Sequence, residues 1–178
     1  MSATTMQHRV SETAARVPGA SVVARYATYA FSLAGIYLSV GFLFYYAAKE
    51  KLIDQSGTMP AGLAKAFHGS FFASVPGNNA AWTILGAMEA LIVVLLAISL
   101  LSGEFLPQRR KPVLLAGLGF ATLTLAVMII ANSMIGNTAL VLGQFTYLGV
   151  AVILTFVVRQ LPPYRPVTWI AGEAAEEE

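Results

Sequence analysis

Residues 112–158 read PVLLAGLGFATLTLAVMIIANSMIGNTALVLGQFTYLGVAVILTFVV, a run of 47 residues without a charged side chain. As one α-helix, this run would measure about 70 Å at about 1.5 Å per residue, whereas the hydrocarbon core of a bilayer is about 30 Å thick. The segment must therefore fold back on itself. Its only turn sequence is Ile-Gly-Asn-Thr at 135–138, which predicts two spanning helices, near 113–135 and 139–158.

Two more apolar segments precede this run. Residues 26–48 and 80–102 are each long enough to cross a bilayer, and Glu89 is the only charged residue within them. Only 11% of the chain is charged, compared with about 25% in soluble domains. We therefore predict an all-α fold, an integral membrane four-helix bundle that occupies residues 25–158.

Both ends of the chain are polar. Residues 1–24 are expected to form a flexible leader, because the first apolar segment is longer than the core of a signal peptide. Residues 159–178 are expected to form a proline-containing acidic tail, in which Trp169 is a candidate anchor at the membrane surface.

The distribution of Lys and Arg predicts the orientation in the membrane. With the leader inside, eight of these residues lie on the inner side, and three lie on the outer side between 49 and 79. Because basic loops are retained in the cytoplasm, both termini are expected to be cytoplasmic, in a bacterial inner membrane. This placement explains the net charge of +2, so we expect no nucleic-acid partner.

The connection at 49–79 is long for a loop and is expected to contain structure. Three apolar residues recur there at helical spacing: Leu63, Phe67 and Phe71. They predict a short helix at the outer membrane surface, which begins after Pro60 and ends before Pro76. The alternative is an ordinary loop packed on the helix ends.

The chain has no cysteine and two histidines, neither in a predicted span. This excludes disulfides, Cys-ligated metal centres and a haem held by two intramembrane histidines. We expect no metal site and no covalently bound cofactor. Electron transfer would require a bound quinone or a partner subunit.

Glu89 is the main candidate for a functional site. A charged group at membrane depth costs about 2.5–3.5 kcal/mol on insertion scales and usually faces the bundle interior. Counting along the helices places three hydroxyl side chains within about 3 Å of its depth; they are Ser39, Thr124 and Tyr147. Since none of these is a cation, we predict a protonated Glu89 that donates a hydrogen bond to one of them. It would act as a proton relay, as an anchor for a quinone head, or as a link between helices.

A second polar set lies at the outer hinge between the last two spans. It consists of Asn132, Ser133, Asn137 and Gln144. The two interpretations are a wet vestibule and simple hydrogen bonding at the turn.

Two sequence motifs resemble the DoxX-like family of small four-helix bacterial membrane proteins. The end of the first span reads GFLF at 41–44 and KEKL at 49–52, and the second span contains GAMEAL at 86–91. The resemblance covers roughly residues 31–134. It implies a non-catalytic or accessory subunit of a membrane redox system, linked to quinone in the best-known branch of the family. The family's functional residues carry over to Glu89 and, more weakly, to Lys49 and Lys51.

Three functions are therefore open. The leading one is a DoxX-like accessory subunit of an oxidoreductase that contacts quinone, and we expect a non-catalytic subunit in preference to an enzyme acting alone. The alternatives are a small proton-coupled transporter or channel that uses Glu89, and a structural assembly factor. Expected partners are the lipid bilayer and either other membrane subunits or further copies of the chain.

Overall fold

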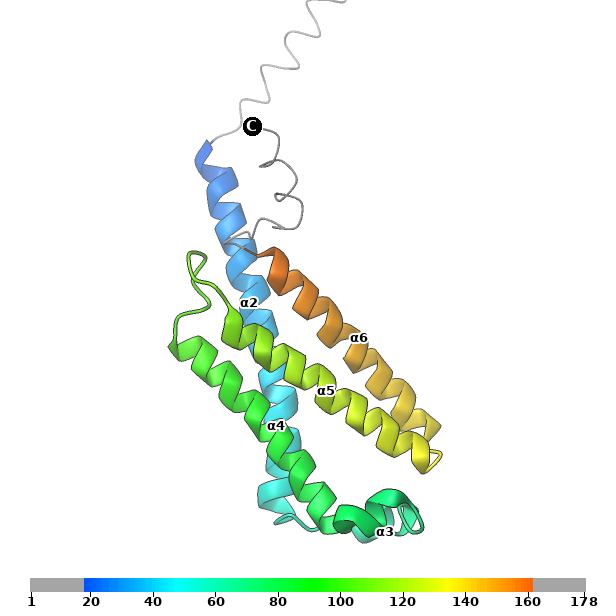
Figure 1. Cartoon of the computed structure of the whole chain (residues 1–178). Coiled ribbons are helices and arrows are strands. Elements are labelled where there is room, and N and C mark those ends of the chain that lie inside the picture. Colours follow the sequence, from blue (N-terminus) through cyan, green and yellow to red (C-terminus); the bar gives the residue numbers. More distant parts are fainter. Residues whose placement is uncertain (1–17, 162–178) are drawn as a thin grey trace, which may run out of the picture. The chain divides into compact units, whose positions relative to one another are not determined.

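The structure of the chain is a computed structural model that describes residues 18–161, with side chains from residue 26 onward. All regular elements in this part of the chain are helical, and four helices are long and apolar enough to cross a membrane (Figure 1). The predictions for residues 1–17 and for the tail beyond 161, including Trp169, lie outside the described residues.

The four long helices agree closely with the predicted spans, except at the N-terminus of the first. They are α2 (Pro18–Lys49), α4 (Asn78–Leu101), α5 (Pro112–Met134) and α6 (Thr138–Gln160). Helix α2 begins at Pro18, so the prediction of a flexible leader up to residue 24 is wrong for 18–24. Proline is favoured in the first turn of a helix, and beyond Gly19 no glycine or proline precedes the apolar span.

The chain divides between Ala34 and Gly35 into two compact units. The first unit ends with the N-terminal part of α2. The second unit contains the rest of α2 and all later elements, and everything described below belongs to it.

Helix α5 is the centre of the second unit, since it packs against both α4 and α6. Its buried residues recur every three or four positions: Leu114, Gly117, Leu118, Ala121, Thr124, Leu125, Ile129 and Asn132. Gly117 lies at the contact with α4, where a Cβ would be in ordinary van der Waals contact with Leu95 (3.5 Å) and Leu96 (3.6 Å). Small residues at such crossings allow membrane helices to pack closely.

Helix α6 packs along one narrow seam. Its buried residues are Gln144, Ala151 and Val158, seven positions apart, while large side chains such as Phe145 and Phe156 are more than half exposed. Two turns of a helix separate residues seven apart, so a single stripe faces α5. The remaining surface is apolar, as the lipid-facing side of a membrane helix is.

A buried carboxylate holds the connection from α4 to α5. Glu104 accepts hydrogen bonds from the backbone N–H groups of Val113 (2.9 Å) and Leu114 (2.8 Å) in the first turn of α5. It also accepts from the Ser99 hydroxyl at 2.7 Å. The first N–H groups of a helix lack partners within it and carry partial positive charge, so Glu104 caps α5.

The outer connection contains three short elements: η1 (Glu50–Asp54), α3 (Ala61–Ala66) and η2 (Ala73–Gly77). Helix α3 begins directly after Pro60, as predicted. The expected helix through Phe71 is wrong, because Gly69 adopts a left-handed φ of +84° and the chain turns there. Phe67 is consequently buried, whereas Phe71 is 64% exposed.

Candidate functional site

A buried ion pair joins Lys51 to Glu89. The Lys51 ammonium nitrogen lies 3.0 Å from Oε1 of Glu89, to which it donates a hydrogen bond, and 3.0 Å from Oε2. The two side chains are 6% and 1% exposed. The prediction that Glu89 faces the interior is confirmed, and its partner is a cation of the outer connection.

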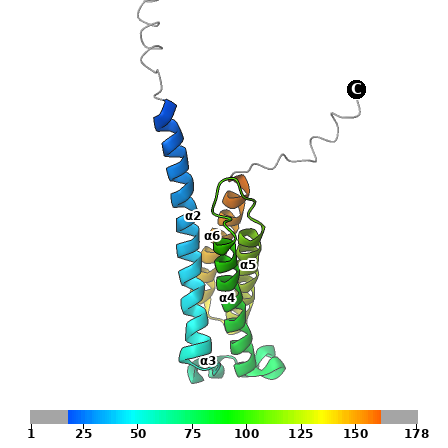
Figure 2. The ribbon, with the colours of Figure 1, turned by 90° about the vertical axis from the view of Figure 1, so that its left-hand side faces the viewer.

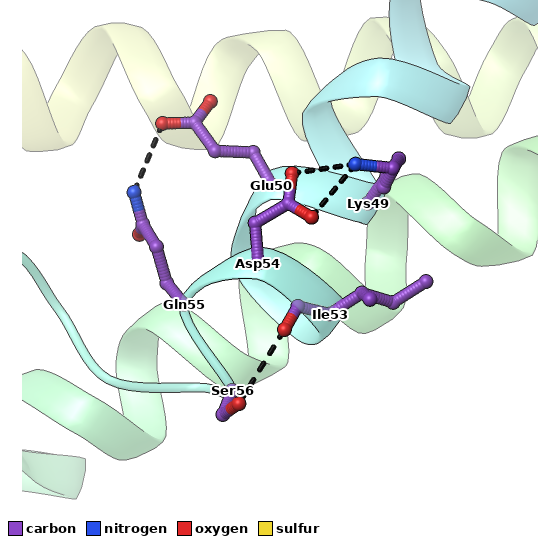
Figure 3. Close-up of polar contacts among 6 residues, drawn as sticks. All are labelled: Lys49, Glu50, Ile53, Asp54, Gln55 and Ser56. Atoms are coloured by element: carbon purple, nitrogen blue, oxygen red, sulfur yellow. Dashed lines mark hydrogen bonds and ion pairs between the residues drawn. The ribbon is translucent and has the colours of Figure 1, made fainter.

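Lys51 reaches this position because α2 continues into η1, a wider π-helical turn. Polar contacts on the outer side of this turn hold its shape (Figure 3). The Lys49 ammonium lies 2.7 Å from both carboxylate oxygens of Asp54. The Gln55 side chain donates to the Glu50 carboxylate at 3.0 Å, and the Gln55 backbone N–H donates to the Glu50 carbonyl at 2.9 Å.

The tryptophan of α4 covers the lysine. The Lys51 ammonium lies 4.8 Å from the centre of the Trp82 ring, within range of a cation–π interaction. The Trp82 indole N–H donates to Oε1 of Gln55 at 2.8 Å, which fixes the ring. Lys51 also donates to the Ala47 carbonyl at 3.3 Å. The ammonium group therefore has three partners: Glu89, the Ala47 carbonyl and the Trp82 ring.

A glycine lets η1 approach α4. A Cβ at Gly86 would lie 3.0 Å from two atoms of the Leu52 side chain and 3.0 Å from Cβ of Lys51. Because that is tighter than most Cβ contacts, a side chain at this position would push Leu52 and Lys51 away from α4 by a few tenths of an ångström. Gly86 lies one turn of α4 before Glu89 on the same face.

One oxygen of the pair has spare hydrogen-bonding capacity. Oε2 of Glu89 is fully buried, and no hydrogen bond reaches it from the described residues, although the Lys51 charge is close. An ionised carboxylate oxygen can accept more than one hydrogen bond. Oε2 therefore has capacity for a further hydrogen bond beside its 3.0 Å contact with the Lys51 ammonium.

The three hydroxyl partners predicted for Glu89 are wrong. The Ser39 hydroxyl donates to the Gly35 carbonyl at 2.7 Å, and the Thr124 hydroxyl donates to the Phe120 carbonyl at 2.9 Å. Tyr147 is 50% exposed on α6. Matching depth along the membrane normal did not account for helix rotation, and two of these hydroxyls bond within their own helices, as Ser and Thr commonly do.

The expectation that Glu89 has no cationic mate in the chain is also wrong. Sequence reasoning placed Lys51 in the outer loop, because it lies three residues beyond the predicted end of the first span. Its position in the KEKL motif was the available signal. With Lys51 at 3.0 Å, the Glu89 carboxyl has a cationic partner, and its protonation stays a prediction.

The second polar set divides into separate local contacts. Asn132 donates to Oε1 of Gln144 at 3.2 Å, which links α5 to α6 in the buried seam. Asn137 accepts from the backbone N–H of Leu140 at 3.3 Å and so caps α6. Ser133 donates to the Ile129 carbonyl at 2.7 Å. These contacts match the turn-bonding interpretation.

No family model matches this chain, and no curated protein or solved structure does.

Proposed function

We propose that this chain is a DoxX-like membrane subunit that associates with an oxidoreductase and contacts quinone at Lys51 and Glu89. In this proposal the subunit lies in a bacterial inner membrane with both termini in the cytoplasm, so the connection that carries Lys51 lies on the outer side and Glu89 lies midway along α4. The buried ion pair carries the proposal.

Burying two charges costs several kcal/mol per ion before their attraction is counted, and apolar side chains of similar size often stabilise a protein better. Ionisable residues at membrane depth are accordingly uncommon and frequently functional. The pair and the aromatic ring of Trp82 adjoin one another, and this combination suits a planar ligand with polar oxygens.

The hydrogen-bonding capacity of Glu89 Oε2 favours a ligand that donates a hydrogen bond. A quinol hydroxyl donates hydrogen bonds, and Oε2 of Glu89 is a buried acceptor that receives none from the described residues. The neighbouring ammonium supplies positive charge for an oxygen that loses its proton. In this proposal the chain binds and orients the quinol, and the electrons pass to the partner oxidoreductase.

The test is purification of the full chain from its own membranes in mild detergent, followed by extraction of bound quinone and identification of co-purified subunits. We expect quinone and redox subunits with the natural chain and at least tenfold less quinone with Glu89→Gln. Ser133→Ala, which changes an exposed hydroxyl outside the pair, is the matched control. A homo-oligomer with neither quinone nor partner overturns the proposal.

The same carboxylate supports a second candidate, a proton-coupled transporter or channel, because a carboxylate can take up and release a proton. Liposomes that contain the purified chain distinguish the two. A pH-dependent solute flux that disappears in Glu89→Gln favours transport, whereas an unchanged quinone content together with lower stability in that variant favours a purely structural role.

A further inference from the structure

We infer that the end of the unit where α4 joins α5 binds the head group of an anionic phospholipid through Arg109, Arg110 and Arg159. This inference concerns the C-terminal end of α4, three turns beyond Glu89, and does not depend on the proposed function.

Helix geometry brings these arginines to one end. Helices α5 and α6 have 23 residues each and are joined by a short turn, so the start of α5 lies beside the end of α6 (Figure 1). Arg109 and Arg110 immediately precede α5, and Arg159 is in the last turn of α6. All three side chains are exposed.

The acidic residue of the same connection, Glu104, is buried and does not face the arginines' surface. Glu104 is 5% exposed, and its oxygens accept from Ser99, Val113 and Leu114. Lys111 is also buried and donates to the Arg109 carbonyl at 3.1 Å. No ion pair involves the three arginines within residues 18–161, so the described part of this surface presents positive charge.

The connection also has apolar side chains suited to the membrane surface. Phe105 and Leu106 follow Glu104 directly and are 45% and 42% exposed. Backbone hydrogen bonds fold the segment into turns, from Leu106 N–H to Gly103 (3.0 Å) and from Arg109 N–H to Leu106 (3.1 Å). The apolar pair therefore lies one turn from the arginines. This combination fits a lipid that has both acyl chains and a phosphate.

Arginine suits this ligand because its planar guanidinium forms paired hydrogen bonds with phosphate oxygens. A basic side chain near an anionic membrane contributes about a fivefold gain in binding. Removal of two arginines is therefore expected to weaken binding about 25-fold.

The experiment counts lipids on the purified full chain by native mass spectrometry, during titration with phosphatidylglycerol or phosphatidylcholine in a non-ionic detergent. We expect phosphatidylglycerol to bind at least tenfold more tightly, and the double variant Arg109→Gln/Arg110→Gln to lose about 25-fold of that affinity. The matched control is Lys65→Gln, an exposed cation on α3, which is expected to change neither lipid. Circular dichroism of each variant checks the fold.

Three results would overturn the inference. They are equal affinity for the two lipids, an equal loss in Lys65→Gln, and unchanged binding in the folded double variant. Glycerol phosphate distinguishes the source of the phosphate: displacement of phosphatidylglycerol at equal concentration indicates a soluble ligand and contradicts the lipid assignment.

Discussion

The Lys51 ammonium and the Glu89 carboxylate, 38 residues apart in sequence, lie 3.0 Å apart inside the protein. The contact fastens the outer connection, which contains α3, to α4 (Figure 2). Because both charges are buried, each is the main compensation for the other. This relationship gives the first prediction.

Lys51→Met or Glu89→Leu alone is expected to lower the free energy of unfolding by about 3–5 kcal/mol, because each leaves an uncompensated buried charge. The double variant is expected to lose less than either single variant, since an apolar pair needs no compensation. Thermal or denaturant unfolding of all four proteins in detergent measures the coupling. Additive losses would show that the two side chains do not stabilise one another.

Gly86→Ala is expected to cost about 1–3 kcal/mol, because overpacking at a close contact forces neighbouring atoms apart. The new Cβ would lie 3.0 Å from Lys51 and Leu52. Gly119→Ala is the matched control, since Gly119 lies in α5 with nothing within 4 Å of an added Cβ, and alanine favours a helix. The free energies of unfolding of the two variants are compared. An equal loss in both contradicts the close approach of η1 to α4.

Glu104→Ala is expected to lower the free energy of unfolding by about 1–3 kcal/mol, because it leaves buried donors without an acceptor. The orphaned donors are the N–H groups of Val113 and Leu114. Gln108→Ala, an exposed substitution in the same connection, should be close to neutral. If hydrogen exchange at the start of α5 is the same in both variants, Glu104 does not cap that helix.

The burial of Lys111 leads us to expect that the free energy of unfolding changes with pH in the alkaline range. Burial lowers the pKa of Lys111 below its ordinary value of 10.5, against the attraction of Glu104. The unfolded chain therefore keeps this proton to a higher pH than the folded protein, and the free energy of unfolding rises as pH passes from the folded pKa toward 10.5.

Comparison with Lys111→Met isolates this effect, because methionine has no proton to lose. The stability of the natural chain relative to that variant should increase between neutral pH and pH near 10.5. Unfolding measured at several pH values tests it, and a difference that does not vary with pH contradicts the prediction.

The sequence by itself determined the number of long helices and the place where the last two meet. Length and charge decide those features, because a run as long as residues 112–158 cannot cross a bilayer once, and IGNT at 135–138 is the only turn within it. The burial of Glu89 also followed from its position as the only charged residue inside the predicted spans.

Only the tertiary structure decided what Glu89 meets. Hydropathy is a local property and says how deep a residue lies, whereas pairing depends on helix rotation and on contacts between distant segments. The turn η1 directs Lys51 inward, and Gly86 permits the approach. For the same reason the sequence did not reveal that Glu104 is buried as the cap of α5, since the connection that contains it reads as an ordinary charged loop.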